Sequence, residues 1–94
     1  MPRIIRLEKA RDGKHKWIAY FDNGRKTRFG AARADDYTLT KNKEQRERYR
    51  QRHQKDLDTK DPTRAGYLSW FILWGDSTSI DENVKDFNRR FGNE

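Results

Sequence analysis

The first thirty residues alternate short runs of β-branched or aromatic residues with turn-forming residues. Runs of this kind favour strands, and the Asn23-Gly24 pair between the second and third run tolerates the positive φ angles of a tight hairpin. Asp12 and Gly13 mark the first turn in a similar way. The pattern predicts three antiparallel strands, over residues 3–7, 16–21 and 25–29.

Residues 30–40 have no sustained hydrophobic period and predict an ordered connection. We expect Tyr37 and Leu39 to anchor this connection in the core. Thr40 is then suited to cap the helix that follows, because a threonine hydroxyl can accept a hydrogen bond from a free backbone N–H of the first helical turn.

Residues 41–57 consist of strong helix formers without glycine or proline. This composition predicts a basic helix. This helix has very little apolar surface. Only Tyr49, His53 and Leu57 recur at steps of four, so these three residues are expected to form its inward stripe.

A third segment, over residues 62–74, predicts a helix that is apolar almost all the way round. Asp61 and Pro62 suit the cap and the first position of this helix, and Gly75 suits its end. Burial on most sides would make it the core element. Its aromatic residues are also candidates for an interface: Trp70, Phe71 and Trp74.

The last segment, over residues 79–91, is the clearest amphipathic helix. Ser79 and Glu82 form a capping-box pattern, and four apolar residues follow at steps of four, three and four: Ile80, Val84, Phe87 and Phe91. The elements together predict one α+β domain over residues 1–94, with an N-terminal three-stranded antiparallel sheet followed by three helices.

The distribution of charge along the chain indicates a class of function. The net charge is +7, but residues 1–60 carry 18 Lys or Arg against 9 Asp or Glu, whereas residues 61–94 carry 4 against 6. Such asymmetry is typical of a surface that binds nucleic acid or another anionic partner. The alternative is a solvated surface whose charge serves solubility.

The sequence also excludes several classes of function. It has no cysteine, no glycine-rich phosphate loop and no Gly-x-Ser-x-Gly elbow. His15 and His53 lack the spacing of a metal pair, and the aspartates at 35, 36, 56, 58 and 61 are explained by loop and helix capping. We therefore expect no enzymatic activity, no cofactor and no metal.

No apolar run approaches the roughly 20 residues needed to span a bilayer, and the N-terminus lacks the apolar core of a signal peptide. The expectation is a protein that is neither secreted nor inserted in a membrane.

Two basic segments are the candidates for nucleic-acid contact. A straight helix over 41–57 would place its cations in two stripes, which are dense enough to follow a phosphate backbone. The alternative is a solvated helix of alternating charge with no ligand. Basic residues of the third strand lie beside Trp17 and Tyr20 of the second strand. These two aromatic residues point to opposite faces of the strand, so at most one of them is exposed for stacking on a base. The candidate residues, expected to form one basic face, are Arg25, Lys26, Arg28, Lys41, Lys43, Arg46, Arg48, Arg50, Arg52 and Lys55.

Three segments carry a resemblance to a known family. They are Phe29-Gly30 leading to Asp36-Tyr37-Thr38, Arg48-Tyr49 with Arg52-His53, and Asp61-Pro62 running through Gly66-Tyr67-Leu68-Ser69 to Ile72-Leu73-Trp74. These segments resemble a family of small uncharacterised proteins of nucleocytoplasmic large DNA viruses, the giant viruses. The resemblance covers about residues 16–91. It implies a viral source, in the virion or in the host cytoplasm or nucleus, but it lends no catalytic residue or substrate.

Two hypotheses follow from these observations. The first is a viral protein that binds nucleic acid, DNA before RNA, through phosphate contacts without reading bases. The second is a minor capsid or virion protein that docks on acidic viral structural proteins and uses the surface from Trp70 to Trp74 as an anchor. An exposed basic stripe would favour the first, and an exposed aromatic patch would favour the second.

Overall fold

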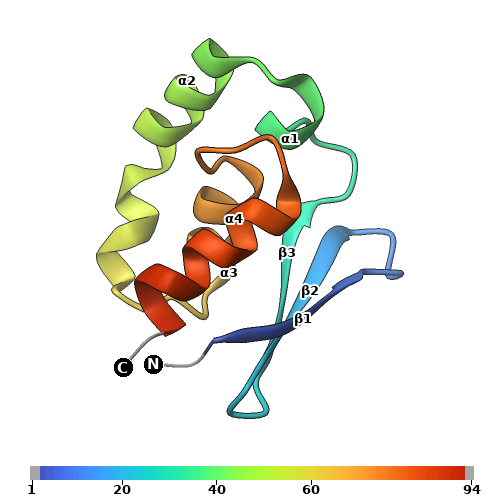
Figure 1. The fold of residues 1–94 in the computed structure, drawn as a ribbon. Coiled ribbons are helices and arrows are strands. Elements are labelled where there is room, and N and C mark those ends of the chain that lie inside the picture. Colours follow the sequence, from blue (N-terminus) through green and yellow to red (C-terminus); the bar gives the residue numbers. More distant parts are fainter. Residues whose placement is uncertain (1–2, 93–94) are drawn as a thin grey trace.

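Three antiparallel strands in the order β1-β2-β3 open the fold: β1 (Ile4–Lys9), β2 (His15–Phe21) and β3 (Lys26–Ala31). The structure, a computed structural model, describes residues 3–92. Four α-helices follow the sheet within these residues, so the predicted α+β class is confirmed, with one helix more than expected (Figure 1). No helix within residues 3–92 has the length and apolar character needed to cross a membrane.

The register of β2 gives the sheet one apolar face and one polar face. Trp17 is opposite Phe29, and Ala19 is opposite both Leu7 and Thr27, so the apolar members of these pairs share the face that packs on the helices. Tyr20 lies on the other face. This register confirms that Trp17 and Tyr20 point in opposite directions.

The short helix α1 (Tyr37–Thr40) lies in the segment for which the sequence predicts an ordered connection without a helix. Asp36 begins it by accepting hydrogen bonds from the backbone N–H and the hydroxyl of Thr38, and the Lys16 ammonium lies 2.5 Å from its carboxylate. Tyr37 is buried as predicted, but Leu39 is 65% exposed, so its assignment to the core is wrong. Two residues span about 200° of a helix, so Tyr37 and Leu39 point to opposite sides.

The basic helix is α2 (Lys43–His53), extended by the 3₁₀ helix η1 (Gln54–Thr59). Its cap is Asn42, whose side chain accepts from the backbone N–H of Gln45, and not Thr40 as predicted. The correction has a backbone cause, because Lys41 adopts the left-handed conformation, with φ of 58°, between α1 and α2. None of the residues of α2 is fully buried.

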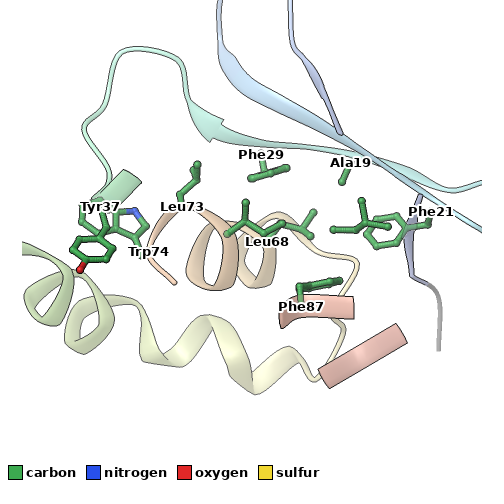
Figure 2. Packing of buried hydrophobic residues seen from close by; sticks show 10 residues of the cluster. Ala19, Phe21, Phe29, Tyr37, Leu68, Leu73, Trp74 and Phe87 are labelled. Atoms are coloured by element: carbon green, nitrogen blue, oxygen red, sulfur yellow. The ribbon is translucent and has the colours of Figure 1, made fainter. Parts of the chain in front are cut away.

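The central helix consists of α3 (Ala65–Leu68) and the π-helix η2 (Ser69–Leu73). It begins three residues later than predicted, because the Asp61 carboxylate accepts from the backbone and hydroxyl of Thr63 and so holds a turn there. Leu68 and Ile72 are completely buried. Figure 2 shows this helix between the sheet on one side and α2 and α4 on the other, which is why it is apolar all round.

The last helix, α4 (Ile80–Phe87) with the π-helix η3 (Asn88–Gly92), covers the remaining side of the core. Ser79 caps it as predicted, by accepting from the backbone N–H of Glu82. Asn88 also joins it to the sheet. The Asn88 side chain accepts from the backbone N–H of Ile4 at 2.8 Å and donates to the carbonyl of Ile4 at 2.9 Å, and so ties the edge strand β1 to the helix.

Phe87 is the residue whose truncation tests this core. Its ring extends from α4 into the core and is fully buried (Figure 2). We expect Phe87→Ala to lower the free energy of unfolding by about 3 to 5 kcal/mol, because the change removes buried apolar area and leaves a cavity. Chemical denaturation of this variant beside Leu39→Ala, which truncates an exposed apolar residue, measures the difference. Equal losses in the two variants would contradict the assigned core.

Candidate nucleic-acid interface

The outward side of α2 and η1 presents a row of cations. Arg48, Arg52 and Lys55 follow one another at steps of four and three residues, so they lie along one side of the helix. All three are exposed, and within residues 3–92 none of them makes an ion pair or a side-chain hydrogen bond. We call these three residues the helix surface. Lys41 and Lys43, at the start of the same segment, are also exposed.

Arg46 and Arg50 of the same helix point inward instead. The Arg50 guanidinium donates to the carbonyl of Trp74 at 2.8 and 3.1 Å and pairs with the Asp76 carboxylate at 3.1 Å. Arg46 donates to the carbonyl of Gly75 at 3.4 Å. These carbonyls follow the end of the central helix, where backbone acceptors lack helical partners and carry partial negative charge. The two arginines therefore anchor α2 and are not part of its free basic surface.

Aromatic stacking completes this anchor. The ring of Tyr49 lies between His53, at a centroid distance of 4.2 Å, and Trp74, at 4.4 Å. Burial raises the pKa of the Tyr49 phenol to about 12, and the nearby Asp56 carboxylate acts in the same direction. Tyr49 is consequently neutral at physiological pH and serves as packing. His53 has a packing place as well, with its Nδ1 3.2 Å from the carboxylate of Asp56.

The sequence does carry a signal for the inward arginines. Arg46, Arg50 and His53 recur at steps of four and three, so the period that predicts His53 on the inward side also places both arginines beside it. Charge by itself favours an exposed position, and for these two residues that expectation is wrong. A long arginine side chain can instead lie along an apolar surface and bring its guanidinium to carbonyl groups.

The outer face of the sheet carries a second group of cations. Tyr20 of β2 lies between its cross-strand partners Arg6 and Lys26, and the Arg6 guanidinium is 4.2 Å from the centre of the Tyr20 ring. Arg28 shares this face one pair further along. We call Arg6, Tyr20, Lys26 and Arg28 the sheet surface. The contribution of Arg6 was not predicted, because it depends on pairing between β1 and β2.

The two basic surfaces do not form one face, so that part of the prediction is wrong. Figures 1 and 2 both show the sheet and α2 on opposite sides of the central helix. This helix contacts β3 on one side and η1 on the other. Arg25 is exposed and belongs to the β2-β3 hairpin. Figure 1 shows this hairpin at the end of the sheet that points away from α2.

The candidate aromatic interface is largely occupied by contacts within the chain. Trp74 is only 7% exposed, and Trp70 and Phe71 are partly buried. The Phe71 ring meets the ring of Phe91 edge-on at 5.0 Å, and the Arg90 guanidinium lies 5.5 Å from the Phe71 ring centre. The described residues therefore present no broad aromatic patch at this helix.

Other chemistry in the described part of the chain is local. Within residues 3–92 no three His, Asp or Glu side chains come together in a way that could hold a metal ion. His15 Nδ1 lies 2.8 Å from the Asp12 carboxylate. This contact, with the backbone N–H groups of Lys14 and His15, holds the pKa of Asp12 well below its usual range. The arrangement caps the loop between β1 and β2.

The profile of one protein family, described as "Family of unknown function (DUF5754)", matches residues 5–53. The chain belongs to this family. The matched segment runs from β1 to the end of α2, so it contains the sheet surface and all of the helix surface except Lys55. No curated protein and no solved structure is similar enough to this chain to count as a match.

The inward and outward arginines of α2 are expected to differ in their effect on stability. Arg50→Gln should lower the free energy of unfolding by about 1 to 2 kcal/mol, because the Trp74 carbonyl is deprived of a charged donor in a partly buried site. Arg48→Gln should stay within about 0.5 kcal/mol of the parent, because Arg48 is exposed and makes no such bond. Urea denaturation of the two variants makes the comparison. A neutral Arg50→Gln would mean that the arginine anchor does not hold α2.

Proposed function

We propose that this protein is a non-enzymatic binder of nucleic acid that contacts phosphates through the helix surface and does not read base sequence. The observation that supports this most directly is the division of cations on α2. Arg46 and Arg50 are used within the chain, whereas Arg48, Arg52 and Lys55 are exposed and have no partner in residues 3–92. Unpaired cations on a fixed helix are suited to bind phosphates.

The geometry of the helix surface fits a phosphate backbone. Arg48 and Lys55 are seven residues apart, which is roughly 10 Å along a helix. The helix is held in place by Arg50 and by the stack of Tyr49 on Trp74, so little side-chain and backbone order has to be gained on binding. Glu44 and Glu47 lie on the same helix and reduce its net charge. They favour weak, salt-sensitive binding over tight binding.

Duplex DNA is the proposed ligand. The resemblance to proteins of large DNA viruses supports DNA before RNA, and it favours a location in the virion or in the host cytoplasm or nucleus. The alternative of a minor capsid protein that docks on acidic partners would draw support from an exposed aromatic anchor. Trp74 is buried and Trp70 and Phe71 are partly covered, so nucleic-acid binding is the better supported proposal.

The test is to replace Arg48, Arg52 and Lys55 together by glutamine. The variant should fold like the parent, because the three side chains are exposed and glutamine keeps helix propensity. Its affinity for a DNA duplex should fall about tenfold or more, and the slope of log K against log salt should shrink by about one unit for each phosphate that the variant no longer neutralises. Fluorescence anisotropy with a labelled duplex measures both quantities.

A control that removes two charges replaces Lys60 and Lys85 by glutamine. Both residues are exposed and lie outside both basic surfaces. This control should keep most of the affinity. Parent binding should also weaken strongly between about 50 and 300 mM salt, since phosphate contacts release counterions. Parent-like DNA binding by the triple variant would show that the helix surface is not the contact. Salt-independent binding would rule out phosphate contacts altogether.

A further inference from the structure

The segment that forms the sheet is also strongly basic, although its cations lie away from the helix surface. Residues 3–31 contain nine Lys or Arg against three Asp or Glu. On the sheet surface, Lys26 makes no ion pair with any residue from 3 to 92. Arg6 and Arg28 face Glu8 and Asp12 at 3.5 and 3.7 Å, in pairs whose side chains are all at least one third exposed. Exposed pairs of this kind are weak, so a phosphate can compete for both arginines.

Opposite positions keep the two surfaces independent. The central helix lies between the sheet and α2 (Figures 1 and 2), and the sheet surface is on the face of the sheet that points away from the helices. Phosphates bound at the two surfaces therefore approach the molecule from different sides. A straight, rigid duplex touches one side of a molecule at a time. Two duplexes can therefore be bound without competing for the same cations.

We propose that one copy of this protein binds two nucleic-acid duplexes at once, one at the helix surface and one at the sheet surface, and so bridges them. The proposal rests on the function proposed above and extends it from binding to cross-linking. The second site is the sheet surface, where Arg6, Lys26 and Arg28 supply the charge for phosphates. The Tyr20 ring makes a cation–π contact with the Arg6 guanidinium and so restricts the position of this guanidinium on the central strand of the sheet.

The experiment captures one duplex with another. A biotinylated duplex of about 30 base pairs, long enough to give each surface many equivalent phosphates, is fixed on beads, and a fluorescent duplex of the same sequence is added with the protein. The parent should retain the fluorescent duplex. Retention should rise with protein concentration and then fall in excess protein, because every duplex then carries its own copies and no free site remains to join them.

Two triple variants separate the surfaces, and each removes three charges. One carries Arg48→Gln, Arg52→Gln and Lys55→Gln, and the other carries Arg6→Gln, Lys26→Gln and Arg28→Gln. Each should keep measurable binding to a single duplex at low salt, because one surface remains, and each should lose capture of the second duplex. The helix variant should be the weaker of the two, about tenfold or more below the parent, because Arg6 and Arg28 of its remaining surface are paired with Glu8 and Asp12. Circular dichroism checks that both fold. The single variant Lys26→Glu gives a milder change on the sheet, and it should reduce capture without abolishing single-duplex binding.

The outcomes distinguish the two proposals. A parent that binds no duplex overturns both the proposed function and the bridging. A parent that binds one duplex but never captures a second one overturns the bridging alone. Capture that survives the replacement of Arg6, Lys26 and Arg28 also overturns it, because the second duplex would then be held elsewhere, for example by the helix surface of another copy in a dimer. Mass measurement by light scattering at the assay concentration identifies that case.

Discussion

Burial of the central helix on two sides is the constraint on which the rest of this structure depends. Leu68 and Ile72 are completely buried, and apolar residues occur on nearly every side of α3 and η2. Exposure of this helix to water would therefore cost free energy on most of its sides. The sheet covers one side and α2 with α4 covers the other (Figure 2). In a domain of 94 residues with 32% hydrophobic residues, this one helix supplies much of the apolar area that folding can bury. The positions of the other elements follow from their contacts with it.

The same constraint decides how the basic residues are used. α2 has almost no apolar residues, so it cannot dock on the central helix by hydrophobic contact alone. Arg46 and Arg50 replace that contact with hydrogen bonds to the carbonyls of Gly75 and Trp74, beyond the end of the central helix. The remaining cations of α2 are left on the far side, facing water. Because the sheet covers the opposite side of the central helix, its own cations face away from α2, and the excess of positive charge is divided between two surfaces.

Two buried asparagines, Asn83 and Asn88, join segments of the chain through hydrogen bonds to backbone groups. The Asn83 side chain donates to the carbonyls of Ile72 and Ser77 and accepts from the backbone N–H of Ser77. Asn88 makes a similar pair of bonds with the backbone of Ile4. Both side chains bond to backbone groups that are buried or partly buried, where an unpaired group would be costly. Nothing in the sequence distinguishes these asparagines from exposed ones, because their partners are 6 to 84 positions away along the chain.

The sequence by itself determined the local elements. Strand-forming runs around Asn23-Gly24, the apolar period from Ile80 to Phe91 and the Ser79 cap each depend on neighbours within a few residues, and each was predicted correctly. Tertiary structure decided which distant groups the polar and connecting side chains meet. Leu39 was assigned to the core but is exposed, because a one-turn helix formed within the expected ordered connection and turned Leu39 away from the side of Tyr37. Arg46 and Arg50 became anchors because the end of the central helix lies beside α2, and the two basic surfaces were separated because the same helix lies between them. Hydrophobic period and capping are short-range properties, whereas the partner of a charge depends on which distant backbone group the fold brings within reach.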